Sequence, residues 1–142
     1  MAEAFVGTWQ LERSENLDAV LEALEVGMMV RTFAPTLTST MEISIDGDQW
    51  TFVVSTMVST TTIKFKLDEQ FTFNEPLTRQ DVEATVHLDG EKLVQEQRNP
   101  QNGKFVRVSR VITEPEPGKQ QLVQTMTVDD TVECVRYFNR IS

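Results

Sequence analysis

The stretch Val132-Glu133-Cys134-Val135-Arg136-Tyr137-Phe138 alternates as a β-strand does, with Val132, Cys134 and Phe138 on its more apolar face. Arg136 lies on that same face. A guanidinium keeps its proton under protein conditions, and burying an unpaired charge is costly. An arginine that faces a barrel or sheet interior therefore requires an acid partner, ordered water in a cavity, or a bound anion.

An earlier stretch, Val106-Arg107-Val108-Ser109-Arg110-Val111-Ile112, has the same property. Arg110 shares a face with Val106, Val108 and Ile112, whereas the face of Arg107 also carries a serine and is less uniformly apolar. Alternation favours Arg110 as the inward residue, and Arg107 takes its place if the preceding loop shifts the register. Two arginines that face one interior predict a pocket for an acid group.

Period-two alternation runs through most of the chain, with turn residues every eight to twelve positions. Asp46-Gly47-Asp48 and Asp89-Gly90-Glu91 are typical hairpin turns, because glycine readily adopts a positive φ and aspartate tolerates it. The pattern predicts ten strands, near residues 5–13, 38–46, 48–57, 60–67, 70–74, 82–88, 92–98, 104–112, 120–128 and 131–140.

The segment from Asn16 to Phe33 departs from this pattern, because its apolar residues recur at helical spacing. Asn16 or Ser14 is expected to cap a first helix, Gly27 to permit a sharp corner, and Pro35 to end a second helix. So many short antiparallel strands close most readily into a barrel, which removes exposed edges. Residues 1–142 are therefore expected to form a single all-β domain.

Composition excludes several classes of function. The formal net charge of −9 argues against a nucleic-acid partner and allows at most transient contact with an anionic membrane. No apolar run approaches a membrane span, and Met1-Ala2-Glu3-Ala4 lacks the features of a signal peptide. We therefore expect a soluble, cytoplasmic protein.

Catalytic and metal-binding chemistry finds little support in the sequence. His87 is the only histidine and Cys134 the only cysteine, so neither a nucleophile–base pair nor a metal cluster is indicated. The sequence also contains no glycine-rich phosphate loop. We therefore expect that the protein is not an enzyme and that it binds neither a metal nor a cofactor.

The layout and several blocks of residues resemble the intracellular lipid-binding proteins, the cytosolic fatty-acid-binding protein family. The blocks run in consistent order along nearly the whole chain: Phe5 to Leu11, Ser14 to Asp18, Val26-Gly27, Val30-Arg31, Phe65 to Leu67 with Phe71, Leu88 to Val94, and Arg136 to Arg140. The resemblance implies a lipocalin-like, monomeric protein. Its fold would be a ten-stranded antiparallel up-and-down β-barrel, or clam, capped by a short helix-turn-helix around a lipid cavity.

The resemblance also has departures. The closing strand of the family usually reads Arg-x-Tyr, and both side chains reach the ligand carboxylate, but here the third position is Phe138. Tyr137 is one residue away, which in a strand means the opposite face. Leu17 and Val58 stand where aromatic residues are usual, and Glu25 replaces a usual glycine.

From these observations we expect non-covalent binding and transport of long-chain fatty acids. Arg136 and Arg110 would bind the ligand carboxylate. The wall around the tail and head group would comprise Phe138, Leu17, Val20, Val58, Phe33 and Cys134. Two alternatives remain: a carrier of retinoids or other hydrophobic acids, and a barrel that acts mainly as an interaction or membrane-apposing protein.

Overall fold

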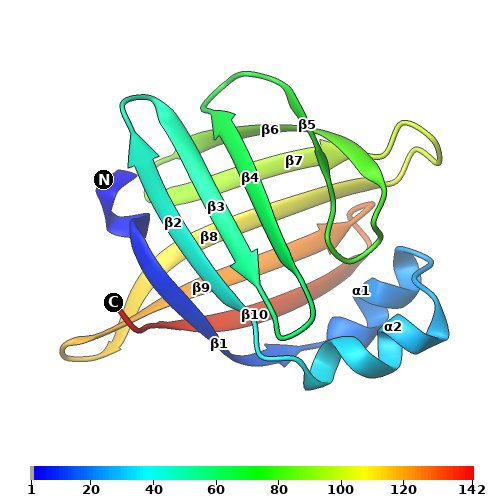
Figure 1. Ribbon diagram of the computed structural model, residues 1–142, viewed down its shortest axis with the longest axis horizontal. Coiled ribbons are helices and arrows are strands. Elements are labelled where there is room, and N and C mark those ends of the chain that lie inside the picture. Colours follow the sequence, from blue (N-terminus) through cyan, green and yellow to red (C-terminus); the bar gives the residue numbers. More distant parts are fainter. Residues whose placement is uncertain (1) are drawn as a thin grey trace.

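A computed structural model describes residues 2–142 and contains a ten-stranded barrel with two short helices at one end (Figure 1). A short 3-10 helix, Ala2–Phe5, precedes β1 (Gly7–Glu15), and α1 (Leu17–Ala23) and α2 (Met28–Phe33) follow it. The remaining strands are β2 (Thr40–Asp46), β3 (Gln49–Ser55), β4 (Thr60–Lys66), β5 (Phe71–Asn74), β6 (Asp81–Asp89), β7 (Lys92–Arg98), β8 (Phe105–Glu116), β9 (Lys119–Val128) and β10 (Val132–Arg140). The ten strands predicted from alternation all form.

The topology is a simple up-and-down meander. Except for β4 and β5, strands that follow one another in the chain pair antiparallel, and β1 also pairs with β10, which gives the order β4-β3-β2-β1-β10-β9-β8-β7-β6-β5. The barrel is therefore nearly closed, and only β4 and β5 are not hydrogen-bonded to each other. At this gap Phe65 of β4 stacks on Phe71 of β5, with ring centroids 5.2 Å apart. Aromatic packing thus joins the two edges where backbone bonding stops.

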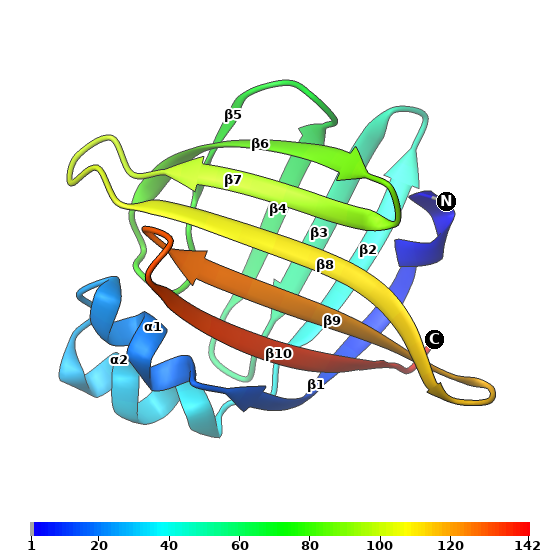
Figure 2. The same ribbon diagram turned by 180° about the vertical axis from the view of Figure 1, so that it is seen from behind.

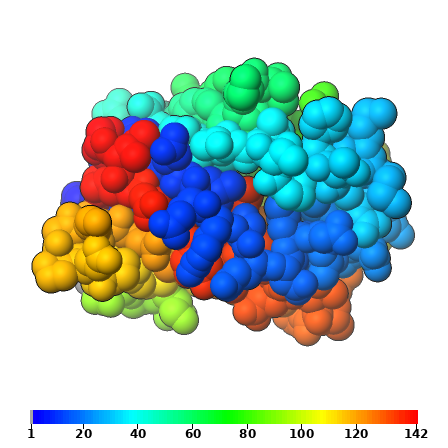
Figure 3. Space-filling view, turned by 90° about the horizontal axis from the view of Figure 1, so that it is seen from below, coloured from blue at the N-terminus to red at the C-terminus, as the bar shows by residue number. Residues whose placement is uncertain are grey.

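The two ends of the barrel differ, as the two opposite views show (Figures 1 and 2). The chain termini lie at one end, where the guanidinium of Arg140 donates to the carbonyls of Ala4 and Val6 and stacks 4.5 Å from the Trp9 ring. The helices cover the other end, beside the β9–β10 turn (Figure 3). Access to the interior is therefore expected at the helical end.

The two helices are attached differently. Leu17, Val20 and Leu21 of α1 are buried against the barrel, whereas α2 buries no residue. Leu17, Val20 and Leu21 pack with Val106, Val108, Val128 and Cys134, which form a second core cluster beneath the helix. α1 is therefore part of the hydrophobic core, and α2 lies on the surface.

Two local predictions for this segment are wrong. The side chain of Asn16 does not cap α1, because Asn16 adopts a left-handed conformation and its amide donates instead to the carbonyl of Glu133, at 2.8 Å. The sharp corner between the helices is at Glu25, with φ of 60°, and Gly27 is extended. The prediction for the end of the second helix is close, because α2 stops at Phe33 and Pro35 lies in the following 3-10 turn.

Candidate functional site

A row of polar side chains crosses four neighbouring strands on the inner face of the barrel. The strand register aligns Arg110 of β8 with Gln124 of β9, Gln124 with Arg136 of β10, and Arg136 with Ser14 of β1. Residues that face each other across strands point to the same side of a sheet. The register therefore brings the two predicted arginines together with a glutamine between them.

Arg110 is 8% exposed, and its hydrogen-bond partners within residues 2–142 are all neutral. Its Nε donates to Gln124 Oε1 at 2.9 Å and its Nη1 to Gln95 Oε1 at 3.1 Å, and the Gln95 amide in turn donates to Gln97. Arg110 has no ion-pair partner among residues 2–142. Burial without a compensating charge lowers the pKa of Arg110 to about 10, so the guanidinium is still charged at neutral pH.

Arg136 is partly buried and likewise has no acidic partner within residues 2–142. Its Nε donates to Ser14 Oγ at 3.0 Å, and no carboxylate in the described part of the chain forms an ion pair with it. Burial lowers the pKa of Arg136, and the nearby Cys134 offsets this only in part. Two uncompensated positive charges therefore share one interior, an arrangement that an anion would relieve.

Arg107 lies on the outer face of β8. Its Nη2 is 3.0 Å from Glu96 Oε2 and its Nη1 is 3.8 Å from Asp130 Oδ1, and about half of its side chain is exposed. The structure thus selects the register that alternation favours, with Arg110 inside and Arg107 in a surface ion-pair network.

The interior contains a cavity of about 360 Å³ that begins at the arginines and opens beneath the helices. Leu17, Phe33, Val58 and Phe138 line it together with Arg110 and Arg136. Val20 and Cys134, predicted as wall residues, do not line it. Both are buried in the core cluster between α1 and the barrel, because they face the packed seam and not the open space.

The sequence prediction missed several polar residues of the site, among them Gln124, Gln95 and Ser14. The signal that identified the arginines was available for the glutamines too. Gln124 alternates in phase with Leu122, Met126 and Val128 on β9, and Gln95 falls between Leu93 and Gln97 on β7. Alternation alone does not place Ser14 on the inner face, because β1 contains a bulge between Leu11 and Arg13 that shifts its register.

No phenol is present at the site. Tyr137, the only tyrosine of the chain, donates its hydroxyl to Glu15 Oε1 at 2.9 Å and lies under the guanidinium of Arg13, on the outer face. Phe138 points inward, is 3% exposed, and has its ring 5.8 Å from Arg136 Cζ. The expected one-residue offset of the tyrosine therefore holds, and Phe138 occupies the inward position beside Arg136.

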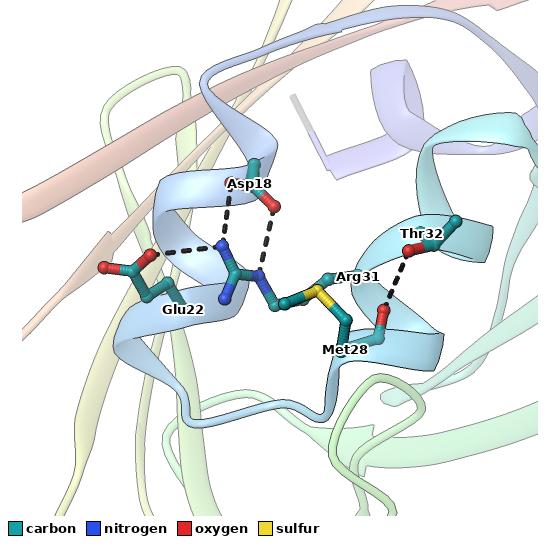
Figure 4. Close-up of polar contacts among 5 residues, drawn as sticks. All are labelled: Asp18, Glu22, Met28, Arg31 and Thr32. Carbon is teal, nitrogen blue, oxygen red and sulfur yellow. Dashed lines mark hydrogen bonds and ion pairs between the residues drawn. The ribbon is translucent and has the colours of Figure 1, made fainter.

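An ion triad joins the two helices (Figure 4). Arg31 of α2 donates to both carboxylate oxygens of Asp18, at 3.1 and 2.9 Å, and to Glu22 Oε2 at 3.1 Å. The hydrogen bond from Arg31 holds the pKa of Asp18 below its ordinary value. Since α2 buries no side chain, this triad is the main polar connection described between the two helices.

No helix in residues 2–142 has the length and apolar character needed to cross a bilayer. No group of three or more histidine, cysteine, aspartate or glutamate side chains is arranged to hold a metal ion in that part of the chain.

A ten-stranded meander with a capped, largely apolar cavity and inward charges defines the class of barrel proteins that enclose a lipid. The chain belongs to the lipocalin / cytosolic fatty-acid binding protein family, whose model matches residues 6–140. This family comprises binding and transport proteins and not enzymes, in agreement with the expectation that the chain is not an enzyme.

Individual relatives resemble the chain over nearly its full length. Sodium/calcium exchanger regulatory protein 1 of Doryteuthis pealeii is 34% identical, with 99% of each chain covered. Cellular retinoic acid-binding protein 2 of Mus musculus is 36% identical, with 96% and 97% covered. The solved fatty acid binding protein of Schistosoma mansoni, in complex with arachidonic acid, has a TM-score of 0.87 at 28% identity, with 98% and 97% covered.

Proposed function

We propose that this protein binds long-chain fatty acids non-covalently and transports them, with the ligand carboxylate held by Arg136 and Arg110. One observation carries the proposal: two guanidiniums that have no acid partner among the described residues face the same apolar cavity. A carboxylate compensates this charge, and its two oxygens match the parallel N–H groups of a guanidinium.

The rest of the ligand is inferred from the cavity wall. Leu17, Phe33, Val58 and Phe138 are apolar, as are most other lining residues, so a long alkyl chain fits the wall better than a polar tail. Burial of such a chain contributes at most about 0.8 kcal/mol per methylene, which suffices for tight binding without a covalent bond. The carrier is proposed to be cytoplasmic and monomeric, without a nucleic-acid partner and with at most transient membrane contact.

A carrier of retinoids or another hydrophobic acid is the second candidate. The relative from Mus musculus, 36% identical, is named for retinoic acid, and a pair of arginines serves any carboxylate. Purified protein recovered from its own cells, extracted and examined by mass spectrometry, distinguishes the candidates by the acid that is found.

Binding itself is tested with delipidated protein and a fluorophore that the ligand displaces. Oleate and retinoic acid are each compared with the alcohol of the same skeleton. The proposal requires that oleate displaces the fluorophore much more effectively than oleyl alcohol does. Equal displacement by acid and alcohol, or no displacement by any of them, would contradict it.

The substitution Phe138→Tyr is expected to strengthen binding of fatty acids. Phe138 already lies beside Arg136, so a hydroxyl on this ring adds a donor to a polar region at small desolvation cost. One such hydrogen bond contributes roughly 0.5–1.5 kcal/mol, a few-fold to about tenfold in affinity. Calorimetry with oleate and oleyl alcohol measures the gain, which should be much smaller for the alcohol. A loss of oleate affinity, or equal gains for both ligands, would place the head group elsewhere.

A further inference from the structure

An unusual set of apolar side chains is exposed around the entrance of the cavity. Met28, Met29 and Phe33 of α2 are 72%, 75% and 61% exposed, and Met57 and Val58 of the β3–β4 turn are 93% and 73% exposed. We call these five residues the mouth patch. Exposed apolar side chains that occur singly are ordinary, but a group of them indicates a surface that a partner covers.

The mouth patch is continuous in space although it comes from two segments. The β3–β4 turn lies beside α2 in both ribbon views (Figures 1 and 2). Met29, Phe33 and Val58 also line the cavity, so the patch surrounds its entrance. None of the residues of α2 is buried, and core packing therefore does not explain why this helix is apolar.

Acidic side chains border the patch on the side of α1. The carboxylate-bearing side chains of Asp18 and Glu22 are 65% and 70% exposed, and Glu25 is exposed at the corner between the helices. Arg31, whose side chain is only 20% exposed, neutralises part of this charge (Figure 4). Three carboxylates against one guanidinium leave this border of the patch negative, in a chain whose net charge is −9.

This combination of charges and apolar groups selects the kind of partner. An anionic lipid surface would be repelled by the exposed carboxylates. A cationic amphipathic helix would place its apolar face on the patch and its lysines or arginines against the acids. Methionine suits such a surface, because its unbranched and polarisable side chain adapts to different apolar shapes.

We propose that the mouth patch and the acids of α1 form a docking surface for a cationic amphipathic helix of another protein. This interaction is additional to the binding of a fatty acid and is defined without reference to it. It turns the helical end of the barrel into a protein-recognition surface.

The test uses model peptides and ligand-free protein. A leucine–lysine helix of about 18 residues, roughly 27 Å long, is compared by calorimetry with a leucine–glutamate helix that has the same apolar face. The lysine peptide should bind at least about tenfold more tightly, and a higher salt concentration should weaken it. A scrambled leucine–lysine sequence, which has the same charge but no apolar face, should bind at least about tenfold more weakly.

Variants with matched controls locate the surface. Met57→Gln and Glu22→Gln should each weaken binding of the lysine peptide by roughly threefold to tenfold. Ile141→Gln and Glu91→Gln change an exposed apolar and an exposed acidic residue at the opposite end of the barrel, and both should leave its affinity unchanged. Equal effects of the two sets would show that binding occurs elsewhere.

Three other outcomes would overturn the proposal. Equal affinity for the lysine and glutamate peptides would remove the role of charge. Binding to phosphatidylserine vesicles without binding to the lysine peptide would identify the patch as a membrane-contact surface. Absence of binding to both would show that the patch does not dock either partner. Since all of these measurements use ligand-free protein, they stand independently of the fatty-acid proposal.

Discussion

Oleate is expected to bind the Arg136→Gln variant roughly 10- to 100-fold more weakly than the wild type. The charge-assisted hydrogen bond that the variant loses is typically worth about 1.5–3 kcal/mol. Arg136 lines the cavity, and within residues 2–142 its one hydrogen bond goes from Nε to Ser14 Oγ, so much of its guanidinium is available to a ligand. Titration of a displaced fluorophore with oleate measures the loss, and oleyl alcohol should lose little.

The matched controls for this experiment are on the same barrel wall. Arg110→Gln should also weaken oleate binding strongly, because Arg110 is the second uncompensated charge of the cavity. Arg107→Gln removes the same charge from the outer face, three residues away, and should leave oleate affinity unchanged. A loss in Arg107→Gln comparable to that in Arg136→Gln would mean that net charge, and not head-group contact, determines binding. Thermal unfolding of each variant checks that it is folded.

The second large effect is on the stability of the fold, and here the substitution is expected to be favourable. The substitution Arg110→Met is expected to raise the free energy of unfolding of the ligand-free protein by about 1–2 kcal/mol. The lowered pKa of Arg110, about 10, corresponds to a burial cost of about 3 kcal/mol. Loss of its hydrogen bonds to Gln95 and Gln124 offsets part of this gain, at about 1 kcal/mol for each.

The pH dependence of this effect follows from the direction of the pKa shift. Because the unfolded chain holds the Arg110 proton more tightly than the folded chain, the burial cost is fully present below about pH 10 and decreases above it. The difference between wild type and Arg110→Met in urea unfolding should therefore be the same at about pH 6 and about pH 9. Arg107→Met, on the outer face, should change stability by less than about 1 kcal/mol. A destabilised Arg110→Met variant would show that the arginine supports the fold rather than burdening it.

Much of the barrel was predictable because local patterns suffice for it. Period-two alternation and the hairpin turns at Gly47 and Gly90 located the ten strands, because these signals depend on neighbours in the chain. The helical pair was recognised from its different period. The inward direction of Arg136 and Arg110 followed from the same alternation, since a charge in phase with apolar residues shares their face.

The parts that the sequence predicted wrongly depend on contacts between distant segments. Val20 and Cys134 are apolar, as residues of a cavity wall usually are. The packing of α1 on β8, β9 and β10 buries them instead in the core cluster beneath the helix. Asn16 is a residue type that often caps helices, but its side-chain amide donates to the carbonyl of Glu133, which is distant in sequence. Local patterns carry no information about which of two buried environments a residue enters.

The sequence by itself thus determined a β-barrel with helices at one end and two arginines directed into its interior. Only the tertiary structure decided that Gln124 lies between these arginines, that Arg107 pairs outside with Glu96, and that the apolar residues of α2 remain exposed around the cavity. The reason is physical. Periodicity assigns a residue to a face of its own strand or helix, whereas strand register, charge pairing and the seating of a helix depend on residues that the chain brings together only on folding.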